Sequence, residues 1–132
     1  MQLKISKEGV FTPEFNGNKK LSAIDQITVR YKTPTVAMKN RCRAKPQAKS
    51  IASRDGKVER LEITIEKDDV ATLNEMLISI SNCFYSEDGG KDRAIVSAQN
   101  LIDAPIEFEP LLKEIIVEFD RILNDSGIDE KN

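Results

Sequence analysis

The sequence predicts an α+β fold, with a small N-terminal antiparallel sheet followed by a mainly helical C-terminal half. Residues 27–32 and 58–66 alternate apolar and polar side chains, which is typical of half-buried strands. Apolar residues recur instead at helical spacing over residues 70–80 and 108–123. A chain of 132 residues is long enough for one domain with its own core.

We therefore expect one domain over residues 1–132. Residues 1–66 should be mostly β, with a basic helix and loop inserted at 35–57. Residues 67–125 should be mostly helical, and residues 126–132 form a polar tail.

Composition narrows the classes of function. Apolar residues make up 39% of the chain and charged residues 32%, a balance typical of a globular protein with a heavily charged surface. The net charge of −2 gives no global electrostatic reason to expect a nucleic acid or membrane partner. No apolar run is long enough to span a bilayer, and residues 1–10 lack the apolar block of a secretory signal. We therefore expect a soluble protein of a reducing cytoplasm.

The first residues are predicted to begin the sheet. Leu3 and Ile5 start an alternating stretch, and Gly9 is expected to break it. Asn16-Gly17 is a strong turn signal because both residues tolerate positive φ.

Two strands follow this turn in the prediction. Residues 27–32 place apolar side chains on one face, and residues 58–66 repeat the pattern. Phe11 and Phe15 flank Pro13-Glu14, and we expect both rings to fill the core of the sheet.

A helix and a loop are predicted between the two strands. Thr35 suits the N-cap of a short helix that runs to Lys45, where Pro46 would end it. Residues 46–57 show no apolar periodicity, so they are predicted to form a mobile loop.

The second half is predicted to contain three helices and a hairpin. The aspartates at 68–69 favour a helix start, and helical spacing extends this helix through Ser81. A hairpin is expected over residues 83–97 around a Gly-Gly turn. Ser97 is then predicted to cap a short helix that Pro105 interrupts.

The terminal helix, Phe108 to Leu123, is the clearest element. Pro110 is compatible with its first turn, and Gly127 is a plausible stop. Ile116 and Val117 widen the apolar surface beyond a narrow stripe. Such a helix is either deeply buried or shared with a partner.

No catalytic or metal-binding constellation is found. The chain has no histidine, which removes the commonest general base and zinc ligand. Cys42 and Cys83 are too far apart in sequence for a zinc or redox motif. The acidic stretch 87–92 lacks the ligand spacing of an EF-hand and is predicted to be a solvated turn. We expect neither an enzyme nor a bound cofactor or metal.

The segment 30–57 is strongly basic, with Asp55 as its single acidic residue. Three interpretations are open: binding to nucleic-acid phosphates, a solvated surface, or contact with the acidic C-terminal part of another subunit. Tyr31 is its only aromatic residue, so the segment offers little surface on which bases could stack. We therefore expect no association with nucleic acid at physiological salt. The basic residues are Arg30, Lys32, Lys39, Arg41, Arg43, Lys45, Lys49, Arg54 and Lys57.

Two segments resemble the tail-assembly chaperones of tailed bacteriophages and prophages. The first is "FTPEFNGNKKLSAIDQITVRYKTPTVAM", in which two aromatics flank Pro-Glu before Asn-Gly-Asn, a strand and a step into a helix. The second is "SAQNLIDAPIEFEPLLKEIIVEFDRIL", which runs from the predicted short helix at Ser97 through the amphipathic terminal helix. Together they cover somewhat under half of the chain. The basic loop and "CFYSEDGG" depart from the family pattern.

The resemblance implies a non-enzymatic function in virion assembly. Such chaperones bind the tape-measure protein, keep it soluble in the cytoplasm of the bacterial host while tail-tube subunits assemble, and are absent from the mature virion. A structural tail-completion or neck protein and a small nucleic-acid-binding regulator using residues 30–57 are the alternatives. Self-association is also compatible with the charge pattern.

A chaperone of this kind needs an apolar, adaptable groove for helical partner segments. We expect the groove to be built from one helix of the middle region and from the terminal helix. The candidate partner-binding residues are Met76, Leu77, Ile80, Leu112, Ile116, Val117, Phe119 and Leu123.

Overall fold

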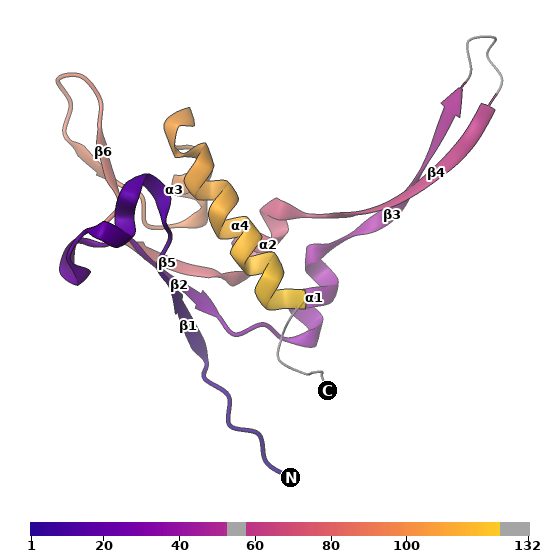
Figure 1. Cartoon of the computed structure of the whole chain (residues 1–132), viewed down its shortest axis with the longest axis horizontal. Helices are drawn as coiled ribbons and strands as arrows, with labels where there is room; N and C mark the ends of the chain where they lie inside the picture. The colour runs from indigo at the N-terminus through magenta and orange to yellow at the C-terminus, as the bar shows by residue number, and fades with distance from the viewer. Residues whose placement is uncertain (53–57, 125–132) are drawn as a thin grey trace.

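A three-stranded antiparallel sheet forms the centre of the protein (Figure 1). The computed structural model describes residues 1–52 and 58–124, with the backbone alone for 43–52 and 58–67. The strands β1 (Glu8–Phe11), β2 (Thr28–Lys32) and β5 (Leu77–Ser81) lie in the order β1-β2-β5. With the helices that follow, this sheet confirms the predicted α+β class.

The helix α4 (Glu109–Asn124) and the helix α2 (Asp69–Met76) pack against the sheet and enclose the core (Figure 1). Val29 of β2 and Phe119 of α4 are fully buried, and the rings of Tyr31 and Phe119 lie 5.6 Å apart between centroids. Phe11 and Phe15 pack against this core as predicted, both partly buried. The buried apolar residues are Val29, Met38, Cys42, Leu73, Met76, Ile80, Cys83, Ile95, Leu101, Leu111, Ile115, Phe119 and Leu123.

Three helices begin at the predicted caps. The Oγ1 of Thr35 accepts a hydrogen bond from the N–H of Met38 at the start of α1 (Val36–Cys42). Asp68 caps α2 in the same way, and Ser97 caps α3 (Ala98–Ile102). A side-chain oxygen at these positions satisfies a backbone donor that the helix itself leaves unpaired.

The prediction that one helix continues through Ser81 is wrong. The helix α2 ends at Met76, and the next residue begins β5, whose Ser79 faces Arg30 of β2. Met76, Leu77 and Ile80 therefore do not lie on one helix. The physical reason is that β-branched Ile78 and Ile80 alternate with serines in "ISIS", and β2 offers a free edge with which this stretch pairs.

The predicted loop at 46–57 is also largely wrong. The helix α1 ends at Cys42 instead of Lys45, and β3 (Arg43–Ala52) pairs antiparallel with β4 (Val58–Lys67). Figure 1 shows this two-stranded ribbon projecting away from the body. Its cause is cross-strand pairing with the alternating strand that follows, a signal that β3 alone does not carry. Residues 53–57 lie outside the described part of the chain.

The ribbon is an insertion between α1 and α2. The N–H of Asp68, directly after β4, donates to the carbonyl of Cys42, directly before β3, at 3.0 Å. This bond closes the base of the ribbon and brings the end of α1 next to the start of α2.

The expected strand at Leu3 and Ile5 is not formed. Both side chains are exposed, and β1 begins at Glu8 with Gly9 inside the strand. Glycine is favoured there because a Cβ would lie 2.2 Å from the Cζ of Tyr31 on the neighbouring strand, and the ring would have to shift.

A hairpin and three 3₁₀ turns complete the fold. The predicted hairpin is confirmed as β6 (Phe84–Ser86) with β7 (Asp92–Ala94), and Gly89 has a φ of +70° in its turn. The 3₁₀ turns are η1 (Phe15–Lys20), η2 (Ala23–Asp25) and η3 (Ile106–Phe108), the last of which leads into α4. Phe108 thus belongs to η3 instead of the terminal helix. The predicted stop at Gly127 and the tail 126–132 lie outside the described residues.

In the part of the chain that the structure describes, no helix is both long enough and apolar enough to cross a membrane.

Candidate protein-binding site

The loop over residues 13–20 has a fixed shape that begins with its turn. Asn16 and Gly17 have φ values of +49° and +74°, as predicted for an Asn-Gly turn. The N–H of Gly17 donates to the carbonyl of Glu14 at 3.1 Å and closes it. The turn reverses the chain between β1 and β2.

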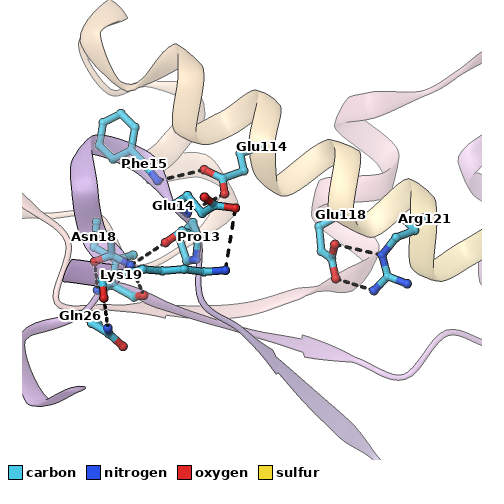
Figure 2. A network of polar contacts seen from close by, with 10 residues as sticks. Pro13, Glu14, Phe15, Asn18, Lys19, Gln26, Glu114, Glu118 and Arg121 are labelled. Carbon is cyan, nitrogen blue, oxygen red and sulfur yellow. Dashed lines mark hydrogen bonds and ion pairs between the residues drawn. The ribbon is translucent and has the colours of Figure 1, made fainter. Parts of the chain in front are cut away.

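Asn18 holds this loop from the inside. Its side chain is buried, and its amide nitrogen donates to the carbonyls of Pro13 at 2.8 Å and Ile27 at 3.0 Å. Its amide oxygen accepts a hydrogen bond from the N–H of Ile27 at 2.6 Å. The side chain therefore mimics a strand partner for residue 27 and ties the loop to the start of β2 (Figure 2).

The loop is bound to α4 through a single carboxylate (Figure 2). Glu114 accepts hydrogen bonds from the backbone N–H groups of Glu14 at 2.6 Å and Phe15 at 3.1 Å. The Nζ of Lys19 lies 3.9 Å from the carboxylate of Glu14, so an ion pair forms within the loop itself. These bonds join two parts of the chain that are far apart in sequence.

Aromatic rings fill the space between the loop and the end of η3. The ring of Phe108 lies 5.8 Å from that of Phe15 and 5.7 Å from that of Tyr85 on β6. Tilted ring pairs at these distances are favourable. The three rings hold the loop, the hairpin and the start of the terminal helix together.

A pocket of about 290 Å³ opens beside these rings. Phe15, Leu21 and Ile27 contribute apolar surface from the N-terminal side, and Phe84 and Phe108 contribute it from the C-terminal side. Two of these side chains remain open to solvent, with exposed fractions of 59% for Phe84 and 50% for Leu21. Large exposed apolar side chains gathered around a concave site are typical of a protein-binding surface.

Asn82 positions one wall of the pocket. It has a φ of +60°, and its amide nitrogen donates to the carbonyls of Ile24 at 2.9 Å and Gln26 at 3.0 Å. Because Asn82 lies between β5 and β6, these bonds hold the segment around η2 against the base of the hairpin.

The pocket carries two acidic side chains, Asp25 and Glu107. The carboxylate of Asp25 accepts a hydrogen bond from the hydroxyl of Ser22 at 2.8 Å. Two carboxylates on an apolar pocket favour a ligand that is apolar at its centre and basic at its edge.

The structure separates the predicted partner-binding residues into three groups. Val117 is 67% exposed. Leu77, Leu112 and Ile116 are partly buried against the core. The remaining four are core residues that contribute no open surface in this conformation; these are Met76, Ile80, Phe119 and Leu123. The pocket is built from none of the eight.

In the basic segment 30–57, some of the residues whose side chains are described pair with carboxylates of the same chain. Arg41 donates from Nε and Nη2 to Glu75 at 2.7 and 3.0 Å, and Arg30 contacts Glu8. The hydrogen bond from Arg41 lowers the pKa of Glu75. These pairs reduce the positive charge that Arg30 and Arg41 offer to a phosphate.

The two thiols are poor nucleophiles. Both cysteines are free and buried, and burial raises the pKa of Cys83 to about 11. Burial also raises the pKa of Cys42. Within the described ranges, no three histidine, cysteine or acidic residues are grouped so as to hold a metal ion.

Sequence reasoning missed Glu114, Asn82 and Phe84. Glu114 and Asn82 act on backbone groups of distant segments, and sequence spacing carries no sign of such contacts. The sequence predicts Phe84 only as part of a hairpin, because its exposure becomes visible only in the structure.

Comparison with protein-family models, with curated proteins and with solved structures finds no match to this chain.

Proposed function

We propose that the protein is a non-enzymatic phage tail-assembly chaperone that binds the tape-measure protein in the host cytoplasm and keeps it soluble. One observation carries the proposal. The two segments that resemble this family meet at the aromatic pocket and contribute most of its lining, from residues 15–27 and 107–108, while residues 82–84 complete the pocket from outside both segments.

The pocket suits a helical segment of the partner. A single large apolar side chain fits a cavity of about 290 Å³, and exposed Phe84 and Leu21 extend the contact along a helix face. Asp25 and Glu107 favour lysine or arginine one turn away from that side chain.

The limited size of the site supports reversible binding. A tape-measure protein has to be released when tail-tube subunits assemble around it, so a chaperone contact should be modest in area and repeated along the partner. A small pocket with an exposed apolar rim meets this need better than an extended obligate interface.

The test is coexpression with the tape-measure protein of the same phage. In Phe84→Glu, a charge replaces an exposed ring at the pocket rim, and we expect the fold to persist while the coexpressed tape-measure protein becomes insoluble. Val36→Glu is the matched control, because Val36 is 80% exposed and Figure 1 places α1 on the other side of the body from β6. The control should keep the partner soluble.

Two results would contradict the proposal. One is failure of the unmodified chain to retain any tape-measure fragment in a pull-down. The other is detection of this protein in stoichiometric amounts in mature particles, which would favour a structural tail-completion or neck protein.

A further inference from the structure

The ribbon of β3 and β4 is a sheet with two open edges. In the described part of the chain the two strands pair only with each other, and Figure 1 shows them extending away from the body. An isolated two-stranded ribbon is marginal in water, and three or more strands are normally needed for stability. An unpaired edge is also a template for another strand.

The two edges differ in their capacity to pair. All charged residues of β3 are basic, so pairing β3 with a second copy of itself brings like charges together. Pro46 in addition has no N–H to donate. The strand β4 contains no proline and carries charges of both signs.

The sequence of β4 is self-complementary. In an antiparallel pair of two β4 strands related by a two-fold axis at Ile63, each charged end position faces one of opposite sign. The facing positions are Glu59 with Lys67, Arg60 with Glu66, Leu61 with Ile65, Glu62 with Thr64, and Ile63 with Ile63.

This register is distinguished from its neighbours by charge. Shifting it by one residue in either direction brings Glu59 opposite Glu66, or Arg60 opposite Lys67. Shifting it by two brings Glu62 opposite itself or opposite Glu66. Like charges directly opposite each other destabilise a sheet, so the two-fold at residue 63 is favoured over these four neighbouring registers, and it pairs more residues of β4 than larger shifts do.

The same register keeps the apolar positions together. Leu61, Ile63 and Ile65 alternate along β4, and Ala48 and Pro46 stand opposite Ile63 and Ile65 on β3. Pairing about Ile63 makes these positions continuous across four strands and gives the ribbon the width that a two-stranded sheet lacks.

We propose that the β4 edge of the ribbon is a homodimerisation site at which two copies of this chain form a four-stranded antiparallel sheet. The contact is isologous, since each copy contributes the same strand, and it closes after two copies. It is independent of the aromatic pocket, which lies on the body of the protein.

The charge pairs provide the first test, by sedimentation velocity of the full chain over a concentration series. Each single change, Arg60→Glu or Glu66→Arg, places like charges opposite each other twice in the dimer. The dimer dissociation constant should then rise roughly tenfold or more. The double variant restores opposite charges between copies and should restore the dimer. Circular dichroism spectra and melting temperatures of the three variants report whether the body remains folded.

The register provides the second test. With Ile63→Cys, the two substituted positions face each other about 5 Å apart between Cα atoms, within the range of a disulfide. With Leu61→Cys, they lie about 14 Å apart along the strands. Under oxidised glutathione, Ile63→Cys should form a crosslinked dimer and Leu61→Cys should not, while native Cys42 and Cys83 are buried.

Several results would overturn the proposal. These are a monomer at all concentrations, equal crosslinking of the two cysteine variants, or a double charge variant no better than the singles. A monomer would point instead to a partner other than this chain.

Discussion

The backbone N–H of Phe15 donates to the carboxylate of Glu114, which lies 99 residues further along the chain. The same carboxylate accepts from Glu14, so one side chain on α4 satisfies two consecutive donors of the loop. A carboxylate that accepts from backbone N–H groups forms charge-assisted bonds that are stronger than neutral ones. The position of the aromatic pocket therefore depends on this contact.

Replacing Glu114 should loosen the loop. Glu114→Ala removes both acceptors, and we expect a loss of about 2 kcal/mol in the free energy of unfolding, because two backbone donors lose their partners. Glu114→Gln keeps one oxygen and should lose less. Urea denaturation measures the change.

Glu118→Gln is the control for this prediction. Glu118 forms its ion pair with Arg121 on the same helix, and because the Arg121 side chain is 57% exposed the pair should contribute less than about 1 kcal/mol. Equal losses for the variants at residues 114 and 118 would contradict the structural role of Glu114.

Asn18 should be the least replaceable polar residue of the loop. Asn18→Ala leaves the carbonyls of Pro13 and Ile27 and the N–H of Ile27 without their partner, and we expect a loss of about 3 kcal/mol. Asn18→Asp keeps the shape of the side chain but places a carboxylate oxygen where the amide donates to two carbonyl oxygens. Because these oxygens repel one another, the loss in the free energy of unfolding at pH 7 should be larger than for Asn18→Ala. Thermal denaturation of both variants checks the order.

Gln26→Ala is the matched control, because the amide of Gln26 also donates to two carbonyls, those of Lys19 and Leu21, but in an exposed setting. Water replaces those bonds, so its loss should stay below about 1 kcal/mol. If Asn18→Ala were as mild as Gln26→Ala, the buried network would not hold the loop.

Local signals are predictable from the sequence, and contacts between distant segments are not. Thr35, Asp68 and Ser97 were predicted as caps because a cap involves residues within one turn of each other. The Asn-Gly turn and the hairpin of β6 and β7 were predictable for the same reason. The α+β class followed from the contrast between alternating and helical apolar spacing.

The segments 46–52 and 77–81 show the limit of such reasoning. Apolar residues at 76, 77 and 80 fit a helix, and the alternation of 77–81 fits a strand equally well. The pairing of Ser79 with Arg30 decides between them. The pocket could not be predicted because its walls come from four elements that meet only in the folded chain.

A side chain at Gly9 should destabilise the fold while Tyr31 is present. In Gly9→Ala the new Cβ would lie 2.2 Å from the Tyr31 ring, which would have to leave its contact with Phe119. We expect a loss of about 2 kcal/mol in the free energy of unfolding, typical of overpacking.

A double-mutant cycle separates this clash from a general effect on the strand. In a Tyr31→Ala background the same Gly9→Ala change should cost little, because the ring is gone and an alanine suits a strand better than glycine. A cost that is unchanged in that background would show that Tyr31 is not the reason for the glycine.

The stability of the fold should decline at high pH because of Cys83. Burial raises the pKa of its thiol from 9.0 to about 11, so between these values the unfolded chain loses a proton that the folded chain retains. The stabilisation is fully present below pH 9 and is lost as the pH rises towards 11.

Other groups titrate in this range, so the comparison is with Cys83→Ala, which lacks the thiol. We expect the difference in unfolding free energy between the wild-type chain and this variant to shrink by up to about 2 kcal/mol between pH 8 and 11. Urea denaturation under reducing conditions at several pH values measures it, and parallel curves for the two proteins would contradict the buried state of the thiol.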